Sequence, residues 1–119
     1  MEKKVQALER KIATIKRHLA LLGDLRPGSL SEQYNVCGSP GCKCKADPPV
    51  KHGPYWQVSF SRKGKSSTRF VKPQHLARVR TQLKAYEKLR TLVDTWITLA
   101  TELANLRIQE TYKKKAPKP

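Results

Sequence analysis

The chain has 119 residues, with 25 Lys and Arg against 9 Asp and Glu, which gives a formal net charge of +16. This length allows one domain with a modest core, and this charge favours nucleic acid as a partner over an anionic membrane surface. The longest apolar run, Leu19 to Leu22, is too short to span a membrane. We expect no secretory signal and a reducing, cytoplasmic setting.

The first predicted segment, residues 1–23, is an amphipathic helix. Its apolar residues follow one another at spacings of 3, 4, 3, 4 and 3: Val5, Leu8, Ile12, Ile15, Leu19 and Leu22. This seam suits an ordinary core helix or a short coiled coil, and either needs a covering partner. Gly23 ends the helix, a linker runs from Arg26 to Ser29, and Ser31 to Tyr34 is expected to form a short helical turn.

The second segment, residues 24–72, contains all three cysteines, spaced Cys37-x4-Cys42-x-Cys44, with His52 eight residues later. Pro40-Gly41 predicts a turn that brings Cys37 back towards the other two thiols. Three thiolates and one imidazole match a closed, structural Zn²⁺ site. We therefore predict zinc bound by Cys37, Cys42, Cys44 and His52.

Two details leave the metal prediction open. The Cys-x4-Cys-x-Cys spacing departs from the common Cys-x2-Cys pattern, so Asp47 or His75 could replace His52 as the fourth ligand. The alternatives to zinc are one disulfide with a free thiol, or three unligated cysteines. An odd cysteine count argues against a disulfide framework, and neighbouring lysines would lower the pKa of the thiols.

A β-hairpin is predicted to complete the second segment. Its strands are expected at residues 55–61 and 65–71, joined by a three-residue loop, Arg62-Lys63-Gly64, with Gly64 in the left-handed region. That loop sets a register in which one face of the hairpin carries an apolar cluster and the other face is basic and exposed to solvent. The apolar face is expected to hold Trp56, Val58, Phe60 and Phe70. The solvent-exposed face is expected to hold Gln57, Ser59, Ser61, Lys65, Ser67 and Arg69.

The third segment, residues 73–112, is predicted to be one long helix that starts at Pro73. Its first half has a narrow apolar stripe under a basic surface. From Val93 onwards the apolar residues cover more than one face and acids outnumber bases, so this half is expected to pack on two neighbours. Residues 113–119 form a basic tail, predicted to be disordered.

Nucleic-acid binding without catalysis is the function that this charge distribution favours. No helix-turn-helix or zinc-finger helix pattern is present, so phosphate contact is expected rather than direct base readout. Tyr34, Tyr55 and Trp56 are candidate stacking groups for single strands. The residues expected to contact phosphates are Arg62, Lys63, Lys65, Arg69, Arg78, Arg80 and Lys84.

Several motifs together resemble an uncharacterised bacterial family of short proteins that share a domain of unknown function. They are Gly28-Ser29-Leu30, the three cysteines, His52-Gly53-Pro54-Tyr55, Gly64-Lys65 and the long helix after Pro73, over roughly residues 25 to 110. The resemblance implies that the cysteines and His52 form one motif. It also implies an association with mobile elements and transposases, and no established activity.

Two other functions compete with nucleic-acid binding. A helical adaptor or inhibitor could bind a larger protein, such as a transposase or nuclease, through its apolar seams. An enzyme is disfavoured because the nine acids show no paired spacing that would hold Mg²⁺, and the cysteines are grouped like ligands. The sequence thus predicts an α+β protein whose long helix packs on the first helix and on a second copy, as a bundle or coiled-coil homodimer.

Overall fold

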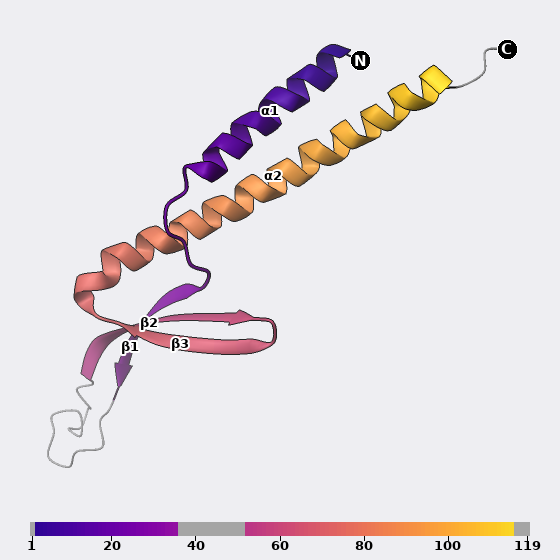
Figure 1. The fold of residues 1–119 in the computed structure, drawn as a ribbon. Helices are drawn as coiled ribbons and strands as arrows, with labels where there is room; N and C mark the ends of the chain where they lie inside the picture. Colours follow the sequence, from indigo (N-terminus) through magenta and orange to yellow (C-terminus); the bar gives the residue numbers. More distant parts are fainter. Residues whose placement is uncertain (1, 36–51, 116–119) are drawn as a thin grey trace, which may run out of the picture. The chain divides into compact units, whose positions relative to one another are not determined.

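A computed structural model describes residues 2–35 and 52–115 and confirms the α+β class (Figure 1). The elements in order are α1 (Glu2–Ala20), β1 (Ser29–Asn35), β2 (His52–Arg62), β3 (Lys65–Val71), the 3₁₀ turn η2 (Pro73–His75) and α2 (Leu76–Lys115). They form two compact units. Unit 1 comprises residues 1–23 and 87–119, and unit 2 comprises residues 24–86, so α2 contributes to both.

Unit 1 is a pair of helices. The predicted seam of α1 is buried at Val5, Leu8, Ile12 and Ile15, and the first three pack in one cluster with Leu103 of α2. Trp96, Leu99, Ala100 and Leu106 pack around that cluster. Two surface ion pairs, Lys4 with Glu102 and Glu9 with Arg107, both at 3.3 Å, join the helices. The expectation that α2 covers the α1 seam is confirmed.

Unit 2 is a three-stranded antiparallel sheet in the order β1-β2-β3, with the start of α2 packed on one face. Its core joins Val58 and Val71 from the sheet to Val79 of α2, with Leu30, Trp56, Leu76 and Leu83 around them. Pro73 begins η2, where its missing N–H leaves no intrahelical bond unmade. The sheet face that carries this core is called the helix side below, and the opposite face the open side.

The strand β1 corrects the predicted helical turn at Ser31 to Tyr34. Only Leu30 in this polar stretch packs against the core, so the sequence offers little apolar alternation to mark a strand. Its partner is β2, which it pairs from Ser29 opposite Ser59 to Asn35 opposite His52. Ladder hydrogen bonds to a neighbouring strand therefore override the weak local signal for a turn.

The register of the β2-β3 hairpin also differs from the prediction. The loop has two residues, Lys63 and Gly64, with φ of 52° and 76°, which is the type I′ geometry of a two-residue hairpin. Gln57 consequently faces Phe70, and Trp56 faces Val71. A slip of one residue moves every β3 side chain to the other face. Val71 is therefore in the core, Phe70 is on the open side, and Lys65, Ser67 and Arg69 are on the helix side.

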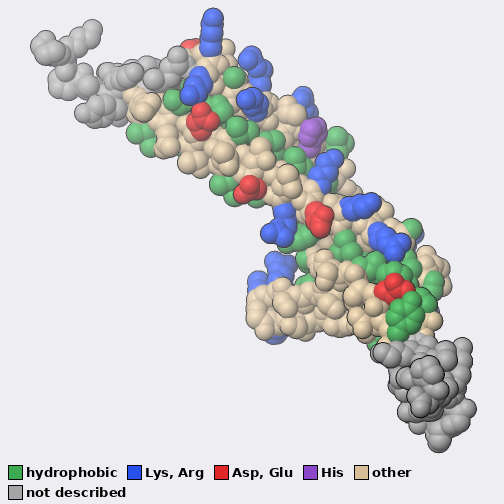
Figure 2. Space-filling view, turned by 180° about the vertical axis from the view of Figure 1, so that it is seen from behind, with side chains coloured by type: hydrophobic (Ala, Val, Ile, Leu, Met, Phe, Trp, Pro, Cys, Tyr) green, Lys and Arg blue, Asp and Glu red, His purple; other side chains and the backbone are tan. Residues whose placement is uncertain are grey.

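No helix in the described ranges combines the length and apolar character needed to cross a membrane. Lys and Arg side chains recur along the surface of both units, and acidic ones are sparse and scattered (Figure 2).

Candidate functional site

The predicted zinc ligands cannot be placed. Cys37, Cys42 and Cys44, and the alternative ligand Asp47, lie in residues 36–51, outside the described part of the chain, as does the side chain of His52. The backbone of His52 is described and pairs with Asn35, so the two ends of that segment meet at one end of the sheet. Within the described ranges, no three His, Cys, Asp or Glu side chains come together.

Gly53 and Tyr34 pack together beside this pair. Gly53 has a φ of 149°, and a Cβ at this position would lie 2.6 Å from Cδ1 of the Tyr34 ring. The hydroxyl of Tyr34 donates a 2.6 Å hydrogen bond to Oε1 of Glu32, and this bond raises the pKa of Tyr34 above its ordinary value. The residues on either side of the segment between Asn35 and His52 are therefore held in place by this packing at the end of the sheet.

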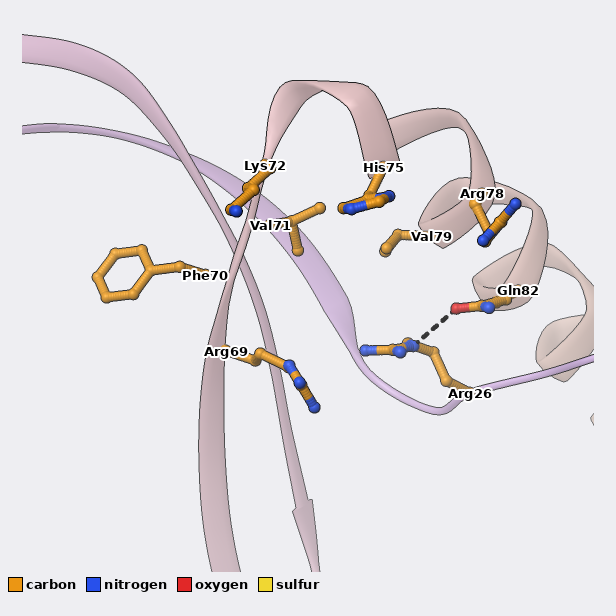
Figure 3. Close-up of a pocket in the computed structure, with 9 residues that line it drawn as sticks. All are labelled: Arg26, Arg69, Phe70, Val71, Lys72, His75, Arg78, Val79 and Gln82. Carbon is orange, nitrogen blue, oxygen red and sulfur yellow. Dashed lines mark hydrogen bonds between the residues drawn. The ribbon is translucent and has the colours of Figure 1, made fainter.

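A hollow of about 410 Å³ in unit 2 is lined mainly by basic side chains (Figure 3). Arg69, Phe70 and Val71 come from β3, Lys72 follows it, His75 comes from η2, and Arg78, Val79 and Gln82 come from α2. Arg26 comes from the linker before β1. Two of the predicted phosphate contacts, Arg69 and Arg78, are brought together here.

Arg26 is held in this hollow by Gln82. Its backbone N–H donates to the carbonyl oxygen of Gln82 at 3.2 Å, and its Nε donates to Oε1 of the same residue at 2.9 Å. Figure 3 shows the guanidinium of Arg26 directed into the space between β3 and α2. Gln82 is neutral, so it fixes the position of Arg26 without offsetting its charge.

No carboxylate lines the hollow among the described residues. Across residues 24–35 and 52–86, Asp24 and Glu32 are the acids, against nine Lys and Arg, and neither acid forms an ion pair there. The nine are Arg26, Arg62, Lys63, Lys65, Arg69, Lys72, Arg78, Arg80 and Lys84. Like charges held together without counter-charges create a positive potential that an anion would relieve.

The other predicted phosphate contacts lie in two separate places. Arg62 and Lys65 face each other at the hairpin tip, with Lys63 in the turn between them. Figure 2 shows basic side chains at the end of this mostly tan hairpin. Arg80 stacks over the Trp56 ring at 5.1 Å to the centroid, a contact that keeps its charge but occupies one face of the guanidinium. Lys84 is exposed one turn further along α2.

Arg26, Lys72 and His75 were missed as members of this cluster. Arg26 is far from the others in sequence and lies in a linker, where no periodic pattern marks its direction. Lys72 and His75 flank Pro73 and belong to the cluster because η2 turns the chain from β3 into α2. The local excess of Lys and Arg was the one available signal.

Comparison with known protein families matches residues 2–81 to the model described as "Domain of unknown function (DUF6788)". The match supports the expected kinship with an uncharacterised family. It includes α1, which lies before the expected limit of residue 25, and it stops within α2. No curated protein and no solved structure matches the chain.

Proposed function

This chain belongs to that family of unknown function, and we propose from its own residues that it binds nucleic acid without catalysis, through phosphate contacts on unit 2. The observation that carries the proposal is the hollow, which Arg26, Arg69, Lys72 and Arg78 line and to which no described residue contributes a carboxylate. Guanidinium groups suit phosphate because their planar donors can bond two oxygens at once.

The charges at the hairpin tip favour an extended polyanion over a small anion as the ligand. Arg62 and Lys65 are directly opposite each other, which is an unfavourable like-charge pair unless a counter-charge is nearby. Lys65 precedes Arg69 by four residues on the same strand, so the tip lies about 13 Å from the hollow. A single phosphate cannot contact both positions, whereas a nucleic-acid backbone, with a charge at every nucleotide, can.

The test is fluorescence anisotropy with labelled single- and double-stranded oligonucleotides at several salt concentrations. Each phosphate contact on duplex DNA contributes about −0.9 to the slope of log affinity against log salt concentration. Replacing two contacts, Arg69→Ala with Arg78→Ala, should weaken binding and make the duplex slope shallower by about 1.8.

The matched control removes the same charge elsewhere. Lys3 and Lys11 are exposed on α1, so Lys3→Ala with Lys11→Ala lowers net charge equally without touching unit 2. It should leave the slope nearly unchanged. The proposal fails if no nucleic acid binds more tightly than about 10⁻⁴ M near physiological salt, the weak end of ordinary non-specific affinity. It also fails if both double variants change the slope equally.

Zinc is the second part of the proposed function, as a structural ion held by Cys37, Cys42, Cys44 and His52. Its support is the donor set in the sequence together with the pairing of Asn35 with His52. In the sequence Cys37 follows the end of β1 by two residues, and His52 begins β2. A closed Cys3His site would stabilise that end of the sheet and supply no open position for chemistry.

The proposed biological setting is that of an accessory protein to a mobile-element or nuclease machinery in a bacterial cytoplasm. A second candidate function, an adaptor or inhibitor that binds such a protein through its helices, is favoured by one observation. Ile97 and Ile108 of α2 remain 60% and 67% exposed after α1 has packed. Measurable nucleic-acid binding that depends on Arg69 and Arg78 distinguishes the first function from the second.

A further inference from the structure

The open side of the sheet is a polar surface with two exposed aromatic residues. The strand pairings place on it ten side chains, none of them charged: Ser29, Ser31, Gln33, Tyr55, Gln57, Ser59, Ser61, Ser66, Thr68 and Phe70. Hydroxyls bond across the strands at Ser61 with Ser66 and at Ser59 with Thr68. Phe70 is 69% exposed and Tyr55 is 42% exposed.

Packing within the described fold does not account for the exposure of Phe70. The neighbouring Val71 is 8% exposed and fills the core position of β3, so β3 already packs on the core through Val71 and does not need Phe70 for this. A single exposed apolar side chain is common and needs no function by itself. Two features distinguish Phe70: the hydrogen-bonding groups around it, and the basic hollow that it borders.

Gln57 is directly opposite Phe70 on β2, and Ser31 is opposite Gln57 on β1. Opposed side chains have Cβ atoms about 5 Å apart, so the Gln57 amide lies beside the ring. The hydroxyl of Thr68, two residues earlier on β3, is on the same face, and Ser31 lies one strand beyond Gln57. Tyr55 follows on the same face, diagonally across from Phe70. The arrangement offers an aromatic face beside groups that can both donate and accept hydrogen bonds, as the edge of a nucleobase requires.

The basic hollow adjoins Phe70 through the backbone of β3. Arg69 and Val71, its immediate neighbours, line the hollow, and Phe70 borders it. Figure 3 shows the ring on the opposite side of β3 from Arg69 and Val71. Because β3 is an edge strand of the sheet, a ligand can contact the hollow and the open side around that edge.

We propose that Phe70 is a stacking position for an unpaired nucleobase, so that the preferred ligand of unit 2 is single-stranded nucleic acid. This inference rests on the proposed phosphate binding and specifies its ligand. Stacking on an aromatic ring is open to every base, because each has a π-face, so little sequence preference is expected. A duplex keeps its base faces stacked on each other and cannot use Phe70.

The test uses fluorescence anisotropy to measure the affinity of the full chain for a poly-uridine RNA, an oligo-thymidine DNA and a duplex of equal length. Phe70→Ala should weaken binding to single strands by about 5-fold or more, the effect expected for one lost stacking contact. The salt slope should not change, because no phosphate contact is removed. Binding to the duplex should change by less than about 2-fold. Phe70→Trp should restore single-strand affinity.

Phe60→Ala is the matched control. Phe60 is on the same hairpin and is also exposed, but its pairing with Ser67 places it on the helix side. This variant should leave affinity for all three ligands unchanged. Thermal melting of each variant checks that the sheet is intact, and quenching of a 2-aminopurine base in the single strand reports stacking directly.

The outcomes separate the two proposals. Equal effects of Phe70→Ala on single strands and duplex, or no effect on either, would overturn the stacking role while leaving phosphate binding through Arg69 and Arg78 in place. Absence of binding to any nucleic acid would instead remove the proposed function, and the stacking role with it. A loss confined to RNA or to DNA would support stacking and identify which sugar the site accepts.

Discussion

Arg26 and Gln82 are joined by two hydrogen bonds, one from the backbone N–H at 3.2 Å and one from the guanidinium Nε at 2.9 Å. They connect the linker that precedes β1 to the second turn of α2, across the helix side of the sheet. The same contact that closes unit 2 thus directs a cation into the hollow. Fold stability and the proposed ligand binding are therefore coupled at this pair.

Gln82→Ala should lower the free energy of unfolding by about 1 kcal/mol, because it removes the side-chain acceptor of a partly buried bond. It should also weaken nucleic-acid binding less than Arg26→Ala does, since Arg26 keeps its charge but loses its orientation. Urea denaturation measures the change in stability, and fluorescence anisotropy measures the change in binding.

Gln74→Ala, at an exposed site in η2, is the control and should change neither stability nor binding. A full loss of binding on Gln82→Ala would mean that Gln82 contacts the ligand itself.

Gly53→Ala should be among the more destabilising single substitutions in unit 2. The positive φ of 149° disfavours any side chain, and the new Cβ would lie 2.6 Å from the Tyr34 ring and 2.9 Å from the carbonyl oxygen of Gln33. Strain and overpacking together predict a loss of about 2 kcal/mol or more in unfolding free energy.

Gly23→Ala is the comparison for Gly53→Ala. A Cβ at Gly23 meets nothing within 4 Å, and the residue has no positive φ, so stability should be unchanged or slightly higher. Thermal denaturation of the two variants side by side measures the difference. Similar melting temperatures would show that the Gly53-Tyr34 contact can relax.

Sequence periodicity predicted the helices well because their signals are long. The apolar residues of α1 make four heptad-like steps, and α2 has forty residues without glycine or proline, so the sequence leaves little choice of structure for either helix. The hairpin was harder, because one turn residue decides its register. Gly64 satisfies both a three-residue loop and a type I′ turn, and the choice depends on Lys63 accepting a φ of 52°.

The candidate site was only partly predictable for the same reason. Arg69 and Arg78 were expected to contact phosphate, but the wrong register put Arg69 on a different face from the one that α2 covers. It also placed Phe70 in the core, so the exposed ring could not be considered as a ligand contact. Arg26 joins the site through a bond to Gln82, a residue fifty-six positions away. Neither the hairpin register nor the bond between Arg26 and Gln82 can be predicted from amino-acid composition.

Zinc binding should be stoichiometric, one ion per chain, in protein purified without added metal. Elemental analysis measures it, and Cys42→Ser should abolish it, because a closed tetrahedral site rarely survives the loss of a thiolate. Removal of zinc by a chelator should loosen the ends of β1 and β2 near Asn35 and His52, seen as faster amide exchange there, with exchange in α1 unchanged. Metal-free protein with the same exchange pattern as the wild type would contradict the prediction.

Self-association is the remaining expectation, and α2 has a face suited to it. The part of α2 in unit 1 runs about 43 Å from Glu87 to Lys115, whereas α1 is about 28 Å long. Trp96 is half-buried against α1, with Lys16 over its ring at 5.3 Å, so α1 already covers this side chain. The exposed face is a different one. Ile97 and Ile108 are eleven residues apart, just over three whole turns, and lie on one line with Thr101.

This line lies about 120° around α2 from Leu103, at 100° per residue, so α1 cannot cover it. The sequence around it, from Val93 to Glu110, has three acids and one Arg, so two copies would meet here without the repulsion that the net charge of +16 imposes elsewhere.

We therefore predict a homodimer at micromolar concentration, seen by sedimentation velocity. Ile97→Glu should shift it to monomer, because a carboxylate would be buried without a partner. Thr95→Glu adds the same charge on the far side of α2 and should leave the dimer intact. A wild-type chain that sediments as a monomer at these concentrations, or equal effects of the two variants, would assign Ile97 and Ile108 to another partner and favour the adaptor function.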